Sequence, residues 1–114
     1  MTSLETAKLA VKILSDKKGI DIKLIKIDSS IADYFVISTG GSSTHVKTLA
    51  DEVEVKLDEA GISVSHIDGH RSDTWIVLDY VDVIVHVFSE EAREYYNLER
   101  LWQDGEEMDI SGID

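Results

Sequence analysis

The sequence predicts an α/β fold in which flanking helices pack on a single mixed sheet of about five strands. Three observations lead to this prediction. A chain of 114 residues without proline suits one compact domain with one hydrophobic core. Short runs rich in β-branched and aromatic residues alternate with longer segments whose apolar residues recur at helical spacing. The order of these segments is helix, two strands, helix, three strands, helix.

The first helix and the first strand fall within residues 2–28. Thr2 and Glu5 have the spacing of a capping box, apolar residues then recur along one face, and Gly19 is the predicted stop. The run DIKLIKID at residues 21–28 is rich in isoleucine and is predicted to be a strand.

A second strand, a glycine turn and a long helix come next. The run YFVIST at residues 34–39 favours a strand, and the glycine pair at 40–41 marks a tight turn. One of the serines at 42–43 is the predicted N-cap of a helix whose apolar spacing continues to a stop at Gly61.

The remaining strands are predicted from three short apolar runs, at residues 62–67, 74–78 and 83–88. Ser89 is the predicted cap of a last helical region, residues 90–102. Residues 105–114 form an acidic tail with little periodicity, which we expect to fray, so that residues 1–104 constitute the domain.

Composition narrows the class of function. The chain has no cysteine, which excludes disulfides and thiolate chemistry, and its apolar runs are too short to span a bilayer. It begins without the profile of a secretory signal, so a cytoplasmic location is expected. The net charge of −12 opposes direct contact with nucleic-acid phosphates and favours a basic protein partner.

The run VLDYVDVIVHVF at residues 77–88 is apolar, yet it carries two aspartates and a histidine. If Tyr80 and Val81 form a two-residue turn, Asp79 lies opposite Asp82 and the two strand faces separate. One face is aliphatic and belongs on the core: Ile76, Leu78, Val83, Val85 and Val87. The other face mixes aromatic and charged groups: Trp75, Val77, Asp79, Asp82, Ile84, His86 and Phe88.

Two interpretations fit this second face. Burying its carboxylates without partners would cost several kcal/mol, so part of the face is expected to be open. An open face with aromatic residues beside acids is typical of a protein-binding surface. The alternative is a half-covered sheet whose aspartates merely cap a turn.

Catalytic and metal sites are also considered. Asp79, Asp82 and His86 could form an acid-base group, but no nucleophile motif accompanies them. His66, Asp68 and His70 alternate in a polar loop and could bind zinc only if a fourth ligand arrived. Neither a catalytic residue nor a metal ligand is therefore assigned.

A competing enzyme hypothesis rests on the Gly40, Gly41 and Ser42 turn, where backbone amides at a helix N-terminus could receive an anion. This turn resembles the Gly-Ser element of nucleotidyltransferases. Those enzymes also hold two metal ions with alternating aspartates on a following strand. Here a long helix follows instead, and a serine-capped turn explains the glycines without a ligand.

The runs ADYFVISTGGSSTHV, WIVLDYVDVIVHVF and REYYNLERLW, in that order, resemble the ribosomal silencing factors, also called the RsfS or Iojap family. The resemblance extends from about residue 4 to residue 104. It implies a noncatalytic protein, without a cofactor, whose fold looks like a nucleotidyltransferase that has lost its active site. It also implies binding to the large ribosomal subunit through the fourteenth protein of that subunit. This binding would keep the small subunit away and repress translation when nutrients are scarce. Some relatives act in large-subunit maturation.

The resemblance and the residue pattern together indicate that the mixed hairpin face binds the basic ribosomal protein, with Trp75 as the apolar anchor. Four further residues are expected to extend the patch: Tyr80, Glu90, Arg93 and Tyr96. An open apolar face is also compatible with a homodimer of the free protein. One departure concerns the turn, because the family usually has glycine where this chain has Val81. A β-branched residue tolerates positive φ poorly, which leaves the turn type and the register open.

Overall fold

The computed structural model describes residues 2–27, 32–69, 74–96 and 105–113. The helices are α1 (Ser3–Asp16), α2 (Ser43–Glu59) and α3 (Glu90–Tyr96). The strands are β1 (Ile20–Lys26), β2 (Tyr34–Gly40), β3 (His66–Asp68), β4 (Trp75–Asp79), β5 (Val83–Ser89) and β6 (Glu106–Met108). The predicted α/β class and element order are confirmed, with one strand added after α3.

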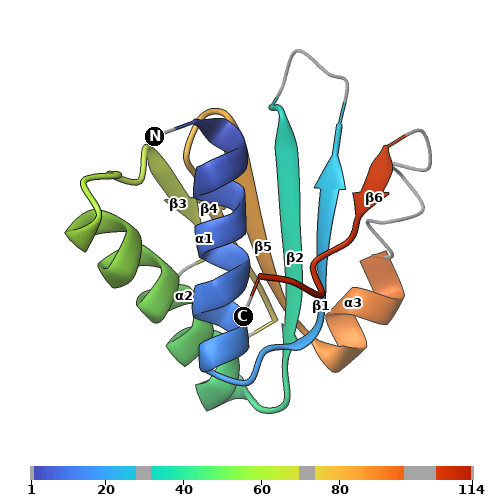
Figure 1. Cartoon of the computed structure of the whole chain (residues 1–114). Coiled ribbons are helices and arrows are strands. Elements are labelled where there is room, and N and C mark those ends of the chain that lie inside the picture. Colours follow the sequence, from blue (N-terminus) through green and yellow to red (C-terminus); the bar gives the residue numbers. More distant parts are fainter. Residues whose placement is uncertain (1, 28–31, 70–73, 97–104, 114) are drawn as a thin grey trace.

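All six strands belong to one sheet, in the order β3-β4-β5-β2-β1-β6. The pair formed by β2 and β5 is parallel and the other pairs are antiparallel, so the sheet is mixed, as predicted. Every residue of the central strand β2 is buried, including the polar Ser38 and Thr39 that follow its apolar residues 34–37. Figure 1 shows α1 and α2 side by side in front of the sheet and α3 apart from them, and α3 packs against β5 and β2.

The N-terminal end of α1 forms as predicted, whereas at its C-terminal end a different residue adopts the left-handed conformation. Thr2 is the N-cap, and its reciprocal bonds with Glu5 complete the capping box. At the other end, the N–H groups of Lys18 and Gly19 bond to the carbonyls of Ser15 and Leu14 at 2.9 and 2.7 Å, which is a Schellman motif. Lys18, with φ of 64°, takes the left-handed position, so Gly19 follows the stop without being the left-handed residue.

Two predictions about strands are corrected. The strand expected at residues 62–67 is confined to β3, because the N–H of Ile62 still bonds to Leu57 at the end of α2. The tail expected to fray instead provides β6, which pairs antiparallel with Leu24 to Lys26 of β1. Met108, Ile110 and Ile113 pack against the core as partly buried residues, and this apolar contact holds the tail on the domain.

The two faces of the sheet carry separate apolar clusters. Between the sheet and the pair α1 and α2 lies the larger cluster, which includes all five residues of the predicted aliphatic hairpin face. On the opposite face, Ile25, Phe35, Ile37, Ile84 and Phe88 pack with Ala92 of α3. None of the helices in the described part of the chain combines the length and the apolar character that a bilayer crossing requires.

Candidate protein-binding face

The β4–β5 hairpin has a register two residues away from the predicted one. Asp79 lies opposite Ile84 and Trp75 lies opposite Phe88, whereas the prediction set them against Asp82 and His86. The two central turn residues are Val81 and Asp82, since the N–H of Tyr80 bonds to the carbonyl of Val83 at 2.9 Å. A shift of two residues leaves each strand side chain on its original face, so the two-faced hairpin is confirmed.

The turn places a strained residue at its tip. Val81 adopts φ of 72°, and its side chain is 62% exposed. The carboxylate of Asp79 accepts the Val81 N–H at 2.7 Å, and the carbonyl of Tyr80 accepts the Asp82 N–H at 2.9 Å. Asp79 is therefore a turn former as well as a surface acid, while the Asp82 side chain stays exposed.

The predicted patch divides into a covered and an open part. Six of its residues reach the surface fully or in part: Trp75, Val77, Asp79, Asp82, Glu90 and Tyr96. Five are buried: Tyr80, Ile84, His86, Phe88 and Arg93. Within the two strands of the hairpin, the patch residues of β4 are thus partly accessible and those of β5 are buried.

Four rings make up the centre of the patch. The Trp75 ring lies 5.1 Å from Phe88, 6.0 Å from His86 and 4.7 Å from Tyr96, measured between centroids. Phe88 is 1% exposed and supports Trp75 from below, whereas Tyr96 of α3 is 46% exposed. Trp75 is therefore held between a core ring and a surface ring, a setting suited to a rigid apolar anchor.

His86 belongs to this cluster as a neutral base. The indole N–H of Trp75 donates to Nδ1 of His86 at 3.2 Å, which places the imidazole proton on Nε2. Burial lowers the pKa of His86 to about 4. Because His86 lies opposite Val77, the Asp79 carboxylate bonds to the Val81 N–H, and Asp82 is a residue of the turn, the acid-base group considered above does not assemble.

Tyr80 was expected to extend the patch, but it lies on the other side of the sheet. Its side chain packs in the cluster beneath α1 and α2 and is 8% exposed. Burial, with the negative charges of Glu54 and Asp58 on α2, raises the pKa of its hydroxyl. The physical reason is strand alternation, since Tyr80 follows Asp79 and therefore faces the opposite way.

Arg93 was expected to extend the patch at the surface, and this is corrected because the residue is buried. Its guanidinium donates to the Asp21 carbonyl and the Thr39 hydroxyl, and it forms an ion pair with the Asp21 carboxylate. Asp21 and Thr39 are 72 and 54 residues away in sequence, so no local pattern could have identified them.

Two amides at the glycine turn have partners within the chain. The N–H of Gly41 donates to Nδ1 of His45 at 2.9 Å, and the hydroxyl of Ser42 accepts the His45 N–H at 3.1 Å. A Cβ at Gly40 would lie 2.7 Å from the backbone nitrogen of Val46, so close packing explains this glycine. The cavity of about 300 Å³ beside the turn is also lined by Glu90 and Glu91, which oppose a phosphate.

The histidine loop offers little support for a metal site. His66 and Asp68 contact each other at 3.1 Å, and both are well exposed. His70, the third candidate, lies outside the described residues. Across residues 2–27, 32–69, 74–96 and 105–113, no three His, Asp or Glu side chains gather in a way that could hold a metal ion.

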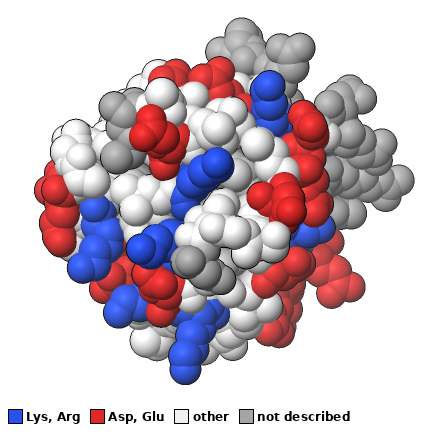
Figure 2. Space-filling view, viewed as in Figure 1, with Lys and Arg blue, Asp and Glu red and all other residues white. Residues whose placement is uncertain are grey.

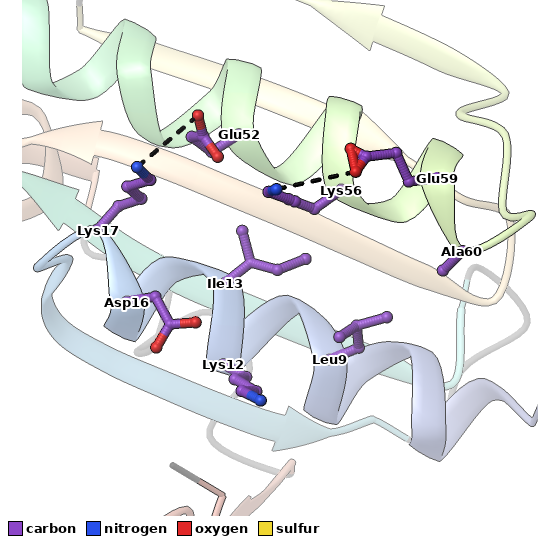
Figure 3. A pocket seen from close by; sticks show the side chains of 9 residues that line it. All are labelled: Leu9, Lys12, Ile13, Asp16, Lys17, Glu52, Lys56, Glu59 and Ala60. Carbon is purple, nitrogen blue, oxygen red and sulfur yellow. Dashed lines mark ion pairs between the residues drawn. The ribbon is translucent and has the colours of Figure 1, made fainter.

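A second concave feature lies between α1 and α2, with a volume of about 630 Å³. Figure 3 shows Leu9 and Ile13 of α1 beside the charged side chains of both helices. Lys17 pairs with Glu52 across the groove at 4.0 Å, and Lys56 pairs with Glu59 within α2 at 3.8 Å. Because cations and anions alternate here, the groove does not select a ligand by charge.

Charge is distributed unevenly along the chain. Residues 1–56 contain eight lysines and eight acids, whereas residues 57–114 contain three arginines and fifteen acids, so the whole net charge of −12 arises in the second half. Figure 2 shows Lys side chains interspersed with acids on the α1 and α2 side. The open residues of the patch include three acids of the second half, Asp79, Asp82 and Glu90, a charge suited to a basic partner.

Several known proteins are similar to this chain in sequence and overall fold. The profile of the family described as "Ribosomal silencing factor during starvation" matches residues 1–114. The ribosomal silencing factor RsfS of Halalkalibacterium halodurans is 36% identical over 99% of this chain and 98% of its own length. That of Bacillus subtilis is 38% identical over 96% of this chain and 95% of its own. A crystal structure of a Chromobacterium violaceum protein superimposes with a TM-score of 0.88 at 40% identity, covering 90% of this chain and 88% of the other.

Proposed function

The chain belongs to the ribosomal silencing factor family, and on this premise we propose that it binds the large ribosomal subunit through its fourteenth protein and blocks joining of the small subunit. Blocking is steric and lowers translation when nutrients are scarce, so the activity requires no catalytic step and no cofactor. The cytoplasmic location expected from the sequence is part of this proposal.

The observation that carries the proposal is the environment of Trp75. Its indole is partly exposed on β4, while hydrogen bonding to His86 and ring contacts with Phe88 and Tyr96 hold it in place. A large rigid ring at a surface loses little entropy on binding and supplies much apolar area. We define the docking face as the open part of the patch: Trp75, Val77, Asp79, Asp82, Glu90 and Tyr96.

Acidic groups surround this anchor and favour a basic partner. Asp79 and Asp82 lie at the turn end of the hairpin, and Glu90 lies where β5 passes into α3. Charges on opposite sides of an apolar anchor orient a cationic surface and speed its approach. The buried residues Ile84, His86 and Phe88 support the docking face from beneath.

The alternative, a nucleotidyltransferase-like enzyme that uses Gly40, Gly41 and Ser42, has less support. Its candidate anion site already has an internal acceptor for the Gly41 amide and two glutamates along the cavity. Calorimetric titration with a magnesium nucleotide tests it, since micromolar binding heat would favour the enzyme.

Sedimentation tests the silencing proposal. Wild-type protein added to separated subunits should reduce the fraction that joins, and should migrate with the large subunit. Trp75→Ala should weaken that binding by roughly tenfold or more, because truncating a central aromatic anchor costs at least about 1.4 kcal/mol. Val55→Ala is the matched control, since Val55 is 52% exposed on α2, away from the docking face.

Circular dichroism melts accompany both variants. Trp75→Ala protein that melts as a folded domain but binds large subunits as tightly as wild type would refute the proposed docking face. Equal loss of binding in Val55→Ala would show that the effect is not specific to the face.

A further inference from the structure

Arg93 connects three segments that are distant in sequence. One terminal nitrogen, Nη1, donates to the carbonyl oxygen of Asp21 at 2.6 Å and to the hydroxyl of Thr39 at 2.9 Å. The other, Nη2, lies 3.2 Å from the Asp21 carboxylate. The Arg93 residue as a whole is 9% exposed, and its guanidinium connects α3 to β1 and β2 of its own domain.

The β1 strand is shaped to receive this guanidinium. The register of β1 against β2 is interrupted between Ile20 and Lys23, and Asp21 within this bulge adopts φ of 48°. Both the backbone carbonyl and the side chain of Asp21 thereby reach one guanidinium. Bulges of this kind commonly redirect a residue toward a specific contact.

The α3 helix needs such a contact. Within the described residues Glu90–Tyr96, its Ser89 cap and buried Ala92 fix only its beginning. Arg93 adds the next attachment to the sheet. Tyr96 follows three residues later, which places it on the neighbouring part of the same helix surface, where its ring meets Trp75.

We propose that Arg93 is the positioning residue of the docking face: it clamps α3 to β1 and β2 so that Tyr96 and Trp75 present one composite surface to the large subunit. This inference rests on the proposed function. Arg93 itself does not touch the partner. Its guanidinium donates twice from Nη1 and places Nη2 beside the Asp21 carboxylate, and a lysine ammonium on a flexible stem lacks this fixed spacing of two nitrogens.

Thr39 provides the sharpest test because it is 4% exposed and lies within the central strand, beyond the reach of any partner. Thr39→Val keeps its shape and removes the hydroxyl that accepts from Arg93. We expect Thr39→Val, Asp21→Asn and Arg93→Lys each to weaken binding to purified large subunits by roughly threefold to thirtyfold, the range seen for residues that act through a network. Thr48→Val and Asp16→Asn, both exposed, are the matched controls and should bind as wild type.

Thr39→Val separates positioning from direct contact, because Thr39 is 4% exposed whereas the Asp21 side chain is 62% exposed and accessible to a partner. If Arg93 touched the partner, releasing it from Thr39 would leave binding unchanged or make it tighter, and that result would overturn the inference. The positioning role also predicts coupling, so the loss caused by Tyr96→Ala should shrink in an Arg93→Lys background. Additive losses in this double-mutant cycle would contradict it.

The inference and the proposed function fail differently. If wild-type protein does not bind large subunits, or Trp75→Ala has no effect, the docking face itself is wrong. If Trp75→Ala weakens binding but folded Thr39→Val and Asp21→Asn proteins bind as wild type, only the role of Arg93 is wrong. Melting curves identify any variant that fails to fold, and Thr39→Val, which removes one hydroxyl and keeps the side-chain shape, is the variant on which the decision then rests.

Discussion

The indole N–H of Trp75 donates a hydrogen bond to Nδ1 of His86 across the β4–β5 ladder, at 3.2 Å. This bond needs a neutral imidazole, because protonation of Nδ1 would replace an acceptor with a donor. It ties the exposed anchor of the docking face to a residue that is 6% exposed. The protonation state of His86 is therefore linked to the stability of the cluster that positions Trp75.

Stability should fall as the solution becomes acidic. Burial depresses the folded-state pKa of His86 from 6.5 to about 4, so the unfolded chain binds the proton more readily. The part of the free energy of unfolding that depends on neutral His86 is fully present above pH 6.5 and is lost as pH falls toward 4. Its total is on the order of 3 kcal/mol. Denaturant unfolding at a series of pH values measures it.

The control for this prediction is His86→Asn, whose amide oxygen can still accept the Trp75 N–H but does not titrate. The variant should be less stable at neutral pH and should depend less on pH between 6.5 and 4. Parallel curves for the two proteins would show that His86 is not the group responsible.

Val81→Gly should stabilise the domain. Val81 holds φ of 72°, which costs a β-branched residue roughly 1–2 kcal/mol, while its exposed side chain contributes little packing. Glycine removes the strain but loses more chain entropy on folding, so we expect a net gain of about 0.5–1 kcal/mol. Val81→Ala, which keeps a Cβ, should gain less, and equal melting temperatures for the two variants would contradict the assignment of strain.

Substitution of the two neighbouring glycines, Gly40 and Gly41, should affect the stability of the domain differently. Gly40→Ala should destabilise the domain by about 1–3 kcal/mol, because its Cβ would lie 2.7 Å from a backbone nitrogen that cannot move aside. Gly41→Ala should be nearly neutral, since its Cβ would meet its nearest side-chain atom, of Ile20, at 3.4 Å. Thermal melts of the two variants test the packing explanation, which fails if Gly41→Ala is the more damaging change.

Removal of the C-terminal tail should weaken the fold. Truncation after residue 104 deletes β6 and the partly buried side chains of Met108, Ile110 and Ile113, with an expected loss of about 2 kcal/mol or more. Gly112→Ala is the control in the same tail, because a Cβ there meets nothing within 4 Å. A truncated protein as stable as wild type would contradict this expectation and support the frayed tail predicted from the sequence.

The sequence by itself determined the features that depend on neighbours along the chain. The capping box of Thr2 and Glu5 and the Ser89 cap involve residues three apart, and both form as predicted. The hairpin faces also follow from sequence, because alternation along a strand assigns each side chain to a face even when the register is two residues off. The family resemblance, carried by ordered motifs, was likewise available from the sequence and is confirmed.

The tertiary structure alone decided which of these residues are accessible. Pairing of β6 with β1, the partners of Arg93 at Asp21 and Thr39, and the burial of His86 and Phe88 arise from contacts between segments far apart in the chain. Such contacts form where the folded backbone brings groups together, and their free energy depends on burial and charge at that place. A local pattern records the residue types present, but it does not record which of them the rest of the chain will cover.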